Sequence, residues 1–292
     1  MKIYEITFSP TGGTKKIADM LTREWSSEIF PIDLTDSKTD LGSLAFTPED
    51  VVVIAVPSYG GRVPGPVVKR LRMMKGNGAK AILVCVYGNR AYEDTLVELQ
   101  DATERAGCRI IAAVAAIAEH SIVRQYAAGR PDEQDQKQLR EFARRIQEKL
   151  SSENFADPKI PGNRPYKRSS GGGIVPKTSR DCTECGVCAR QCPVQAIDLK
   201  DPSNTDKKAY LLYEVRLCLP AFGKKRKRHH AEGGKYRAEK SLLRSQGRGM
   251  VSLMKENPAP VLYGLPYKCS VSPLLLFYVL AFPFIGFFSF HF

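Results

Sequence analysis

Several features that mark common protein classes are absent from this chain of 292 residues. The first residues, MKIYEITF, hold one lysine and alternate like a strand, without the apolar run of a secretory signal. The glycine-rich turn that follows has no lysine where a nucleotide-triphosphate loop requires one. A dinucleotide fingerprint and a convincing internal repeat are missing as well. We therefore expect a cytoplasmic protein that is neither an ATPase nor a repeat protein.

The composition excludes a mostly disordered chain, because 43% of the residues are hydrophobic and 26% are charged. The net charge of +13 belongs to the C-terminal third, since residues 201–292 carry 15 basic and 6 acidic side chains. The densest basic run is KKRKRHH at 224–230. No aromatic interleaving accompanies it, so we interpret it as a solvated stretch and expect no specific nucleic-acid binding.

The first 150 residues alternate short apolar runs with helical patterns. Runs typical of strands lie at 3–8, 28–34, 51–56, 81–86 and 109–117, and helical patterns lie at 14–25, 67–74, 92–106 and 132–150. The runs at 51–56 and 81–86 are apolar throughout, as in strands that are buried on both faces. The sequence therefore predicts an α/β domain with a doubly wound, five-stranded parallel sheet.

A phosphate-binding loop is predicted between the first strand and the first helix. There, Ser9-Pro-Thr-Gly-Gly-Thr14 combines glycines, which let backbone N–H groups approach a ligand, with hydroxyls and a helix N-terminus. The candidate residues are Ser9, Thr11, Gly12, Gly13 and Thr14. An ordinary capped helix start after a tight turn remains the alternative.

Two more glycine-containing loops follow the third and fourth strands. They read PSYGGRVP at 57–64 and YGNRAY at 87–92. In open α/β sheets ligands bind beyond the carboxyl ends of the strands, and a flat ring needs aromatic partners and exposed backbone there. Each loop taken alone is compatible with an ordinary turn. The candidate residues are Tyr59, Gly60, Gly61, Tyr87, Gly88 and Asn89, with Tyr92 as a further stacking partner.

The strongest motif is Cys182-x2-Cys185-x2-Cys188-x3-Cys192-Pro193. Thiolates are soft ligands, and three cysteines at this spacing, followed by a fourth before proline, are typical of iron–sulfur ligation. Zinc is the rival, but zinc sites usually use two separated C-x2-C pairs. We interpret the motif as the metal site of a [4Fe-4S] cluster.

Together these segments resemble bacterial fusion proteins that join a flavodoxin-like domain to a ferredoxin-type domain. Segments AEHS at 118–121 and IPGNRPY at 160–166 are similar too, so that the resemblance extends to about residue 218. It implies that the loop 9–14 holds the phosphate of FMN and that the loops with Tyr59 and Tyr87 line its isoalloxazine ring. The residues alone give Glu119 and His120 no catalytic role, and a hydrogen-bonded turn is the simpler interpretation.

The second cysteine motif of a two-cluster ferredoxin is missing. Cys218 stands where it would begin, but the next three ligand positions hold Ala221, Lys224 and Arg228. One cluster at most is therefore expected. The predicted organisation is a flavodoxin-like domain at 1–150, a linking arm at 151–180, a small ferredoxin-type domain at 181–220 and an irregular C-terminal tail at 221–292.

The tail leaves two hypotheses open. Residues 271–292 have no Lys, Arg, Asp or Glu and are mostly apolar, so they are a candidate membrane anchor. The two prolines at 273 and 283 weaken that interpretation. A shifted reading frame after Cys218 would equally explain why the motif and the resemblance end together.

The predicted function is electron transfer between FMN and a [4Fe-4S] cluster, with redox proteins as partners. One alternative is a flavin-dependent reductase of a small molecule. The other is a degenerate or membrane-attached binding protein whose cluster site no longer works. The sequence does not decide between an electron carrier and an FMN-dependent oxidoreductase.

Overall fold

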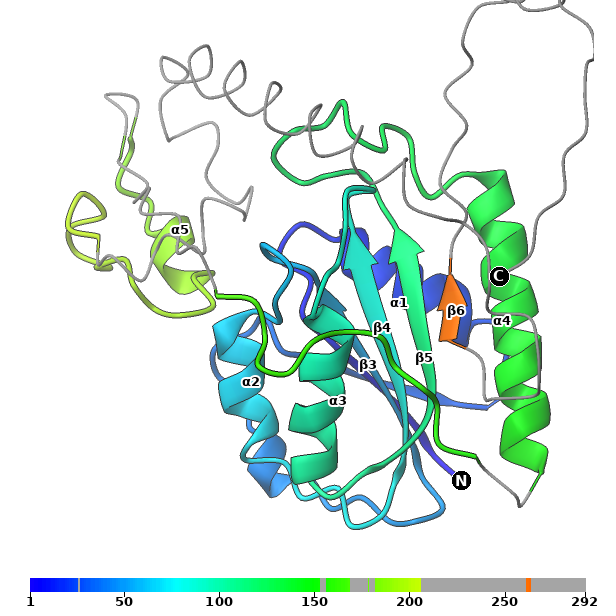
Figure 1. Ribbon diagram of the computed structural model, residues 1–292. Coiled ribbons are helices and arrows are strands. Elements are labelled where there is room, and N and C mark those ends of the chain that lie inside the picture. The colour runs from blue at the N-terminus through cyan, green and yellow to red at the C-terminus, as the bar shows by residue number, and fades with distance from the viewer. Residues whose placement is uncertain (26, 153–155, 169–177, 179–181, 206–260, 264–292) are drawn as a thin grey trace, which may run out of the picture.

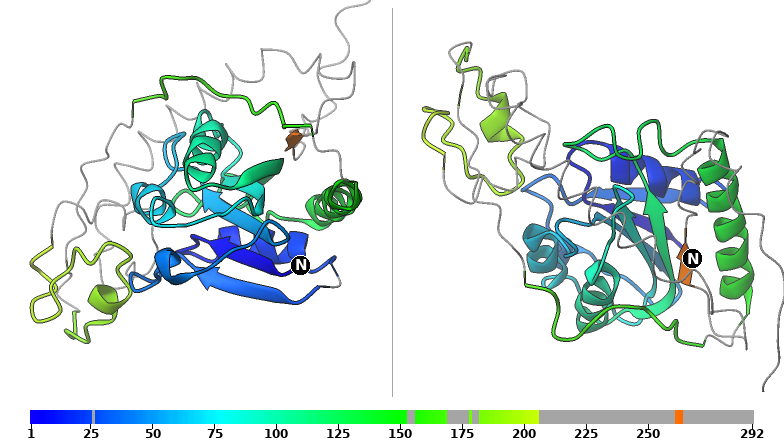
Figure 2. Two further views of the ribbon diagram at one scale, coloured as in Figure 1. Left: turned by 90° about the horizontal axis from the view of Figure 1, so that it is seen from below. Right: turned by 45° about the horizontal axis from the view of Figure 1, so that its top comes forward.

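A parallel sheet forms the centre of the protein, with helices on both of its faces (Figures 1 and 2). The computed structural model describes residues 1–25, 27–152, 156–168, 178, 182–205 and 261–263. The strand order is β2-β1-β3-β4-β5-β6. The order 2-1-3-4-5 of its first five strands is that of flavodoxin-like doubly wound sheets, as predicted.

All the strands that pair in this sheet run parallel. Their bounds are Ile3–Thr7 for β1, Ile29–Asp33 for β2, Val51–Pro57 for β3, Lys80–Tyr87 for β4, Arg109–Ile117 for β5 and Val261–Tyr263 for β6. The predicted positions of the first five strands are confirmed to within one residue at each end. The short β6 was not predicted: it comes from the tail and pairs with β5.

Five helices and one short 3-10 helix accompany the sheet within the described residues. They are α1 Gly13–Thr22, the 3-10 helix η1 Leu41–Ser43, α2 Gly65–Leu71, α3 Thr95–Arg105, α4 Glu133–Ser151 and α5 Val187–Arg190. The start of α4 is fixed by a capping box, in which Asp132 and Asp135 bond each other's backbone N–H groups. The predicted helices are confirmed, with shifted ends. α1 and α2 each end three residues earlier than the patterns indicated, α2 begins two residues earlier, and α3 begins three residues later.

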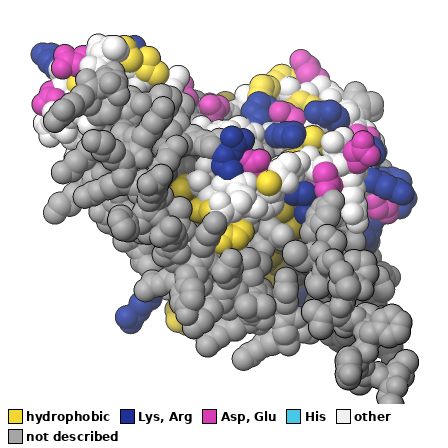
Figure 3. Space-filling view, turned by 90° about the horizontal axis from the view of Figure 1, so that it is seen from above, with side chains coloured by type: hydrophobic (Ala, Val, Ile, Leu, Met, Phe, Trp, Pro, Cys, Tyr) yellow, Lys and Arg dark blue, Asp and Glu magenta, His cyan; other side chains and the backbone are white. Residues whose placement is uncertain are grey.

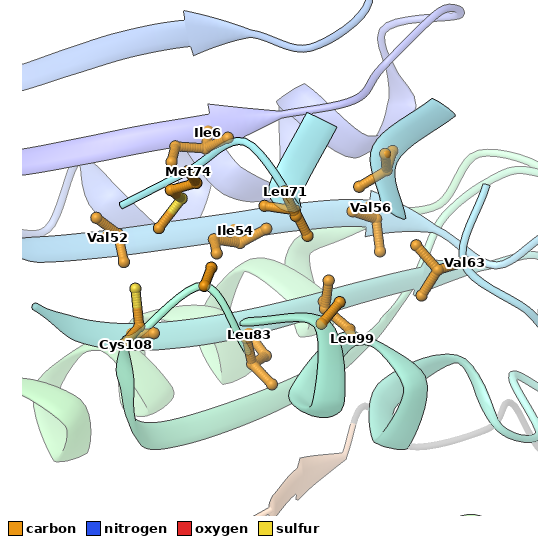
Figure 4. Close-up of a cluster of buried hydrophobic side chains, with 14 of the residues drawn as sticks. Ile6, Val52, Ile54, Val56, Val63, Leu71, Met74, Leu83, Leu99 and Cys108 are labelled. Atoms are coloured by element: carbon orange, nitrogen blue, oxygen red, sulfur yellow. The ribbon is translucent and has the colours of Figure 1, made fainter. Parts of the chain in front are cut away.

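The core has two halves, one on each face of the sheet. Val52, Ile54 and Val56 point toward α2 and α3 (Figure 4), whereas Val51 and Val53 point toward α1 and α4. This alternation along β3 follows from the two-residue period of a strand. It explains why the run is apolar throughout, as expected for a strand buried on both faces.

Two described segments continue the chain beyond α4. Residues 156–168 run along the sheet domain beside α3, and residues 182–205 lie beside one end of α2 (Figures 1 and 2). Among the residues that the structure describes, no helix is long and apolar enough to cross a membrane. The predicted anchor at 271–292, the basic run at 224–230 and Cys218 lie outside the described residues.

Candidate cofactor sites at the carboxyl edge of the sheet

The loop after β1 forms an open backbone turn that leads into α1. Gly12 has a φ of 82°, which favours glycine, and the helix starts after it without a side-chain cap. Ser9 Oγ accepts the backbone N–H of Lys15 at 2.8 Å, so the hydroxyl proton of Ser9 stays available to donate. The first amides of the helix, those of Gly13 and Thr14, have no acceptor inside the helix. The loop can therefore offer converging donors to an anion.

The space above this loop is unobstructed by described residues. A Cβ added at Gly12 or Gly13 would meet no atom within 4 Å. Thr11 is exposed and Thr14 is buried. Small residues and free space thus occur together at a helix start, a place where anions commonly bind. That this loop holds a phosphate group stays a prediction.

The loop after β3 is closed by a tight turn at its two glycines. Tyr59 and Arg62 exchange backbone hydrogen bonds of 3.0 and 3.2 Å, and Gly60 and Gly61 between them have φ values of 61° and 84°. Positive φ at both central residues is the geometry of a type I′ turn, which glycine adopts without strain. Gly60 faces open space, whereas a side chain at Gly61 would overlap the carboxylate of Glu93.

The loop after β4 places two aromatic rings edge to face. The centroids of Tyr87 and Tyr92 lie 5.3 Å apart, with 67° between the ring planes. Both rings and that of Tyr59 are half-buried against the core on the α2 and α3 face. Asn89 has a φ of 62°, which Asn tolerates better than most residues.

His120 covers Gly88 and holds the next loop in shape. A Cβ at Gly88 would come within 2.6 Å of the His120 ring, so glycine is required for this close approach. Nδ1 of His120 accepts the backbone N–H groups of Ile122 and Val123, each at 3.1 Å. Burial and the nearby Arg90 lower the pKa of His120, which favours the neutral ring. The prediction that the Glu-His pair forms a hydrogen-bonded turn is confirmed.

A buried carboxylate joins the loops at 57–64 and 87–94, called the ring loops below, to residues 160–168 of the arm. Asp94 is 1% exposed and accepts the Asn163 N–H at 2.8 Å, the Asn163 amide at 3.0 Å and the Lys167 N–H at 2.6 Å. Its own N–H donates to Gly61 O at 3.1 Å. Burial works to raise the pKa of Asp94, but the hydrogen bonds from Lys167 and Asn163 outweigh it and hold the pKa below its usual value. Asp94 therefore holds the loops at 57–64 and 87–94 and the arm together as an anion.

Arg62 makes a second connection between the same parts. Its guanidinium forms two 2.7 Å bonds to Glu98, donates to Lys167 O at 2.7 Å and lies 4.9 Å from the centroid of the Tyr166 ring. The Tyr166 hydroxyl bonds Asp101, which also pairs with Arg164. The predicted linker thus packs, at 160–168, on the loops that were predicted to hold the flavin.

The cysteine segment has a small core of its own. Ala189, Cys192, Ala196 and Ile197 are buried together, and Cys192 Sγ accepts the Ala196 N–H at 3.2 Å. Cys182 and Cys188 are half-buried and Cys185 is exposed. Hydrogen bonds from the Val187 N–H and the Thr183 side chain lower the pKa of the Cys185 thiol, which favours the thiolate that binds metals.

The four thiols are suitable in type and spacing for a cluster, but they are not gathered in this structure. Within the described part of the chain, no three Cys, His, Asp or Glu side chains lie close enough to hold a metal ion. A thiolate site commonly takes its final shape on binding metal. The donor set therefore fits an iron–sulfur cluster by its chemistry, and binding would draw Cys182, Cys185 and Cys188 together.

Among the described residues, charge gives no further indication of a ligand at this edge. Viewed from the side of the carboxyl ends, the described surface mixes basic, acidic and hydrophobic side chains (Figure 3). One cavity lies elsewhere. It has a volume of about 240 Å³, and Gln100, Glu104, Arg109 and Asp157 are among its lining residues.

Sequence reasoning placed the loop residues at one edge of the sheet, where the structure has them. It missed Arg62, Asp94 and Glu98, whose partners lie 35 to 105 residues away along the chain. The only signal for the arm was the likeness of segment 160–166. The contact of Arg70 with the cysteine segment, described below, had no sequence signal.

Comparison with known proteins agrees with the cysteine motif. Residues 177–198 match the family described as the 4Fe-4S binding domain. This match confirms that the motif is of the 4Fe-4S type, and it follows a flavodoxin-like sheet in the chain, as the resemblance predicted. Among curated proteins, none matches this chain.

Solved structures similar to this chain include several flavin proteins. A Streptococcus pneumoniae flavodoxin is 18% identical, with 50% of this chain and 99% of that chain covered and a TM-score of 0.38. An NADH:FMN oxidoreductase in its apo form is 18% identical, with 52% and 91% covered and a TM-score of 0.38. Rubredoxin oxygen:oxidoreductase from Desulfovibrio gigas is 15% identical, with 51% and 36% covered and a TM-score of 0.33. The fold assignment rests on strand order and register, not on these neighbours.

Proposed function

We propose that this chain is an electron-transfer protein that binds FMN at the carboxyl edge of β1, β3 and β4 and an iron–sulfur cluster in the cysteine segment. The observation that supports this best is the open, glycine-rich turn at the start of α1. It stands at the β1/β3 position where flavodoxin-like sheets bind ligands. A 4Fe-4S motif in the same chain supplies the second redox group.

The roles of the chain's own residues follow from their contacts. The amides of Gly13 and Thr14, with the hydroxyls of Ser9 and Thr11, would hold the phosphate. The loops that carry Tyr59 and Tyr87 would line the ring. FMN takes two electrons and releases them singly, which suits a relay to a one-electron cluster. Redox proteins in a reducing compartment such as the cytoplasm are the proposed partners.

The experiment is anaerobic reconstitution of the full chain, followed by counts of flavin, iron and sulfide. We expect about one FMN and about four irons per chain. Thr11→Ala should weaken FMN binding about tenfold, since one lost hydrogen bond to a charged group contributes roughly 1.5 kcal/mol or more. Lys16→Ala, on the exposed side of α1, is the control. A chain that binds no FMN would contradict the proposal.

A second candidate is a flavoprotein without a working cluster. It is favoured by the missing second cysteine motif. The same counts decide between the two functions. In the relay, Cys185→Ser should lower the iron content while FMN stays near one per chain. Wild-type protein with FMN but no iron would establish the second candidate instead.

A further inference from the structure

Arg70 is a buried cation that contacts no carboxylate among the described residues. It lies in the last turn of α2, is 8% exposed, and donates from one nitrogen to Leu34 O and from the other to Pro193 O at 2.8 Å. Both acceptors are neutral backbone carbonyls. Burial lowers the pKa of Arg70, and Asp36 and Asp33 act in the opposite direction from a distance. Removing a guanidinium from water costs free energy, and neutral carbonyls offset that cost less than a carboxylate would.

The two carbonyls belong to different parts of the chain. Leu34 follows β2, and its N–H bonds Thr7 O at the end of β1. Pro193 is buried and directly follows Cys192 in the cysteine motif. The planar fork of arginine can reach two acceptors at once, which an ammonium group does less well. Arg70 therefore bridges the end of β2 and the cysteine segment.

The bridge lies next to the phosphate loop. Thr35, which follows Leu34, accepts the Ser9 N–H at 2.8 Å through its hydroxyl. Residues 182–205 accordingly lie beside α2 at the edge that carries the predicted flavin loops (Figures 1 and 2). The segment's own buried core of four residues is too small to be stable alone, so it depends on contacts of this kind.

We propose that Arg70 fastens the cysteine segment to the flavodoxin-like domain beside the phosphate loop, so that the two halves of one chain face each other in a fixed position. The consequence for electron transfer rests on the proposed function. A loaded cluster is held by thiolates, and a nearby buried cation is one of the means by which a protein adjusts its potential. Arg70 is thus a positioning residue for the iron–sulfur half.

The test is hydrogen exchange on the full chain, as purified and after reconstitution. Protected amides that report on the segment are those of Arg190, Gln191, Cys192 and Gln195, which make backbone hydrogen bonds. In Arg70→Met, which keeps the aliphatic stem, these amides should exchange at least tenfold faster while β3 and β4 exchange as in the wild type. Arg72→Ala removes an exposed arginine from the end of the same helix and should change nothing.

Unchanged exchange of these amides in Arg70→Met would overturn the proposal. If Arg70→Met unfolds, Arg70→Lys is the second variant. It keeps the charge but reaches both carbonyls less well, and it should still loosen the segment more than Arg72→Ala does. Equal exchange in Arg70→Lys and Arg72→Ala would overturn the proposal in the same way.

Electron transfer within the reconstituted chain gives a second measurement. After flash reduction of bound FMN, one electron leaves the flavin and one electron reduces the cluster. We expect this step to be at least tenfold slower in Arg70→Met, with the flavin and iron counts unchanged. An unchanged rate would overturn the positioning role. A wild-type chain that binds no cofactor would instead contradict the proposed function, and the exchange measurement on the purified chain would still decide whether Arg70 docks the segment.

Discussion

At the scale of single residues, the glycines of the ring loops serve different purposes. Gly60 has positive φ and open space beside it, so only its backbone conformation requires glycine. Gly88 has no such φ, but the His120 ring fills the place where a side chain would start. The same residue type therefore meets a conformational need at one position and a packing need at the other. A sequence pattern alone does not separate the two.

Gly88→Ala tests the packing role. The added methyl would lie 2.6 Å from the His120 ring and 2.9 Å from its Cβ, so the loop must move. We expect the free energy of unfolding to fall by about 1–3 kcal/mol, as for other overpacked sites, and FMN binding to weaken. Thermal unfolding and flavin titration measure the two effects. Gly65→Ala, where a Cβ meets nothing within 4 Å, is the matched control. Equal stability of both variants would contradict the role given to His120.

At the scale of elements, the arm at 160–168 is held largely by carboxylates on the α3 side. Asp94 and Asp101 both have a pKa below the usual value. For Asp94 the hydrogen bonds from the arm overcome its burial, and for Asp101 the main cause is the hydrogen bond from Arg164. A carboxyl with a lowered folded pKa stabilises the folded state fully above its unfolded pKa. That contribution is lost as the pH falls through the folded value.

The arm should therefore detach in acid. Below about pH 4, near the ordinary Asp pKa, the free energy of unfolding should decline, and the amides of Asn163 and Lys167 should exchange faster. Asp94→Asn removes an acceptor for the Lys167 N–H, so it should loosen the arm at pH 7 and reduce the dependence on pH. Urea unfolding from pH 7 to pH 3 checks the expectation. A wild-type dependence as weak as that of Asp94→Asn would refute it.

The sequence predicted features that depend on neighbouring residues better than contacts between residues far apart in the chain. The runs at 51–56 and 81–86 predicted their strands correctly, because a strand buried on both faces consists of apolar residues throughout. The turn at 9–14 was visible because glycines and hydroxyls are local signals. The contacts of Asp94 and Arg62 with the arm were not predicted, since their partners lie about 70 and 105 residues away along the chain. Nothing near either residue distinguishes a buried anchor from a surface charge.

At the scale of the whole molecule, the flavodoxin-like domain extends beyond the sheet and its helices. The last helix of the sheet domain, α4, ends at Ser151. Asn163 and Tyr166, which follow it, bond Asp94 and Asp101, and Arg62, which precedes it, bonds Glu98. The arm leads from the ring loops toward the cysteine motif. The linker predicted at 151–180 is therefore, over 160–168, a structural part of the flavodoxin-like domain.

Shortened chains should reveal this dependence. A chain of residues 1–168 retains every described contact of the arm, and we expect it to bind FMN about as tightly as the full chain. A chain of residues 1–152 lacks the three hydrogen bonds that Asp94 accepts from the arm, and each hydrogen bond to a charged group contributes roughly 1.5–3 kcal/mol. It should bind FMN at least tenfold more weakly. Flavin fluorescence titration compares the two, and equal affinities would show that the arm is dispensable.

The long separation between the arm and its partners also sets an order of events during synthesis. A chain grows from its N-terminus, and domains fold as their residues emerge from the ribosome. The ring loops at 57–64 and 87–94 emerge long before residue 163, so they first exist without the arm that holds them. They become complete once residue 168 has emerged, while the first cysteine of the motif, Cys182, is still to come. Under the proposed function, the growing chain therefore completes its flavin loops before the motif that would bind iron has been made.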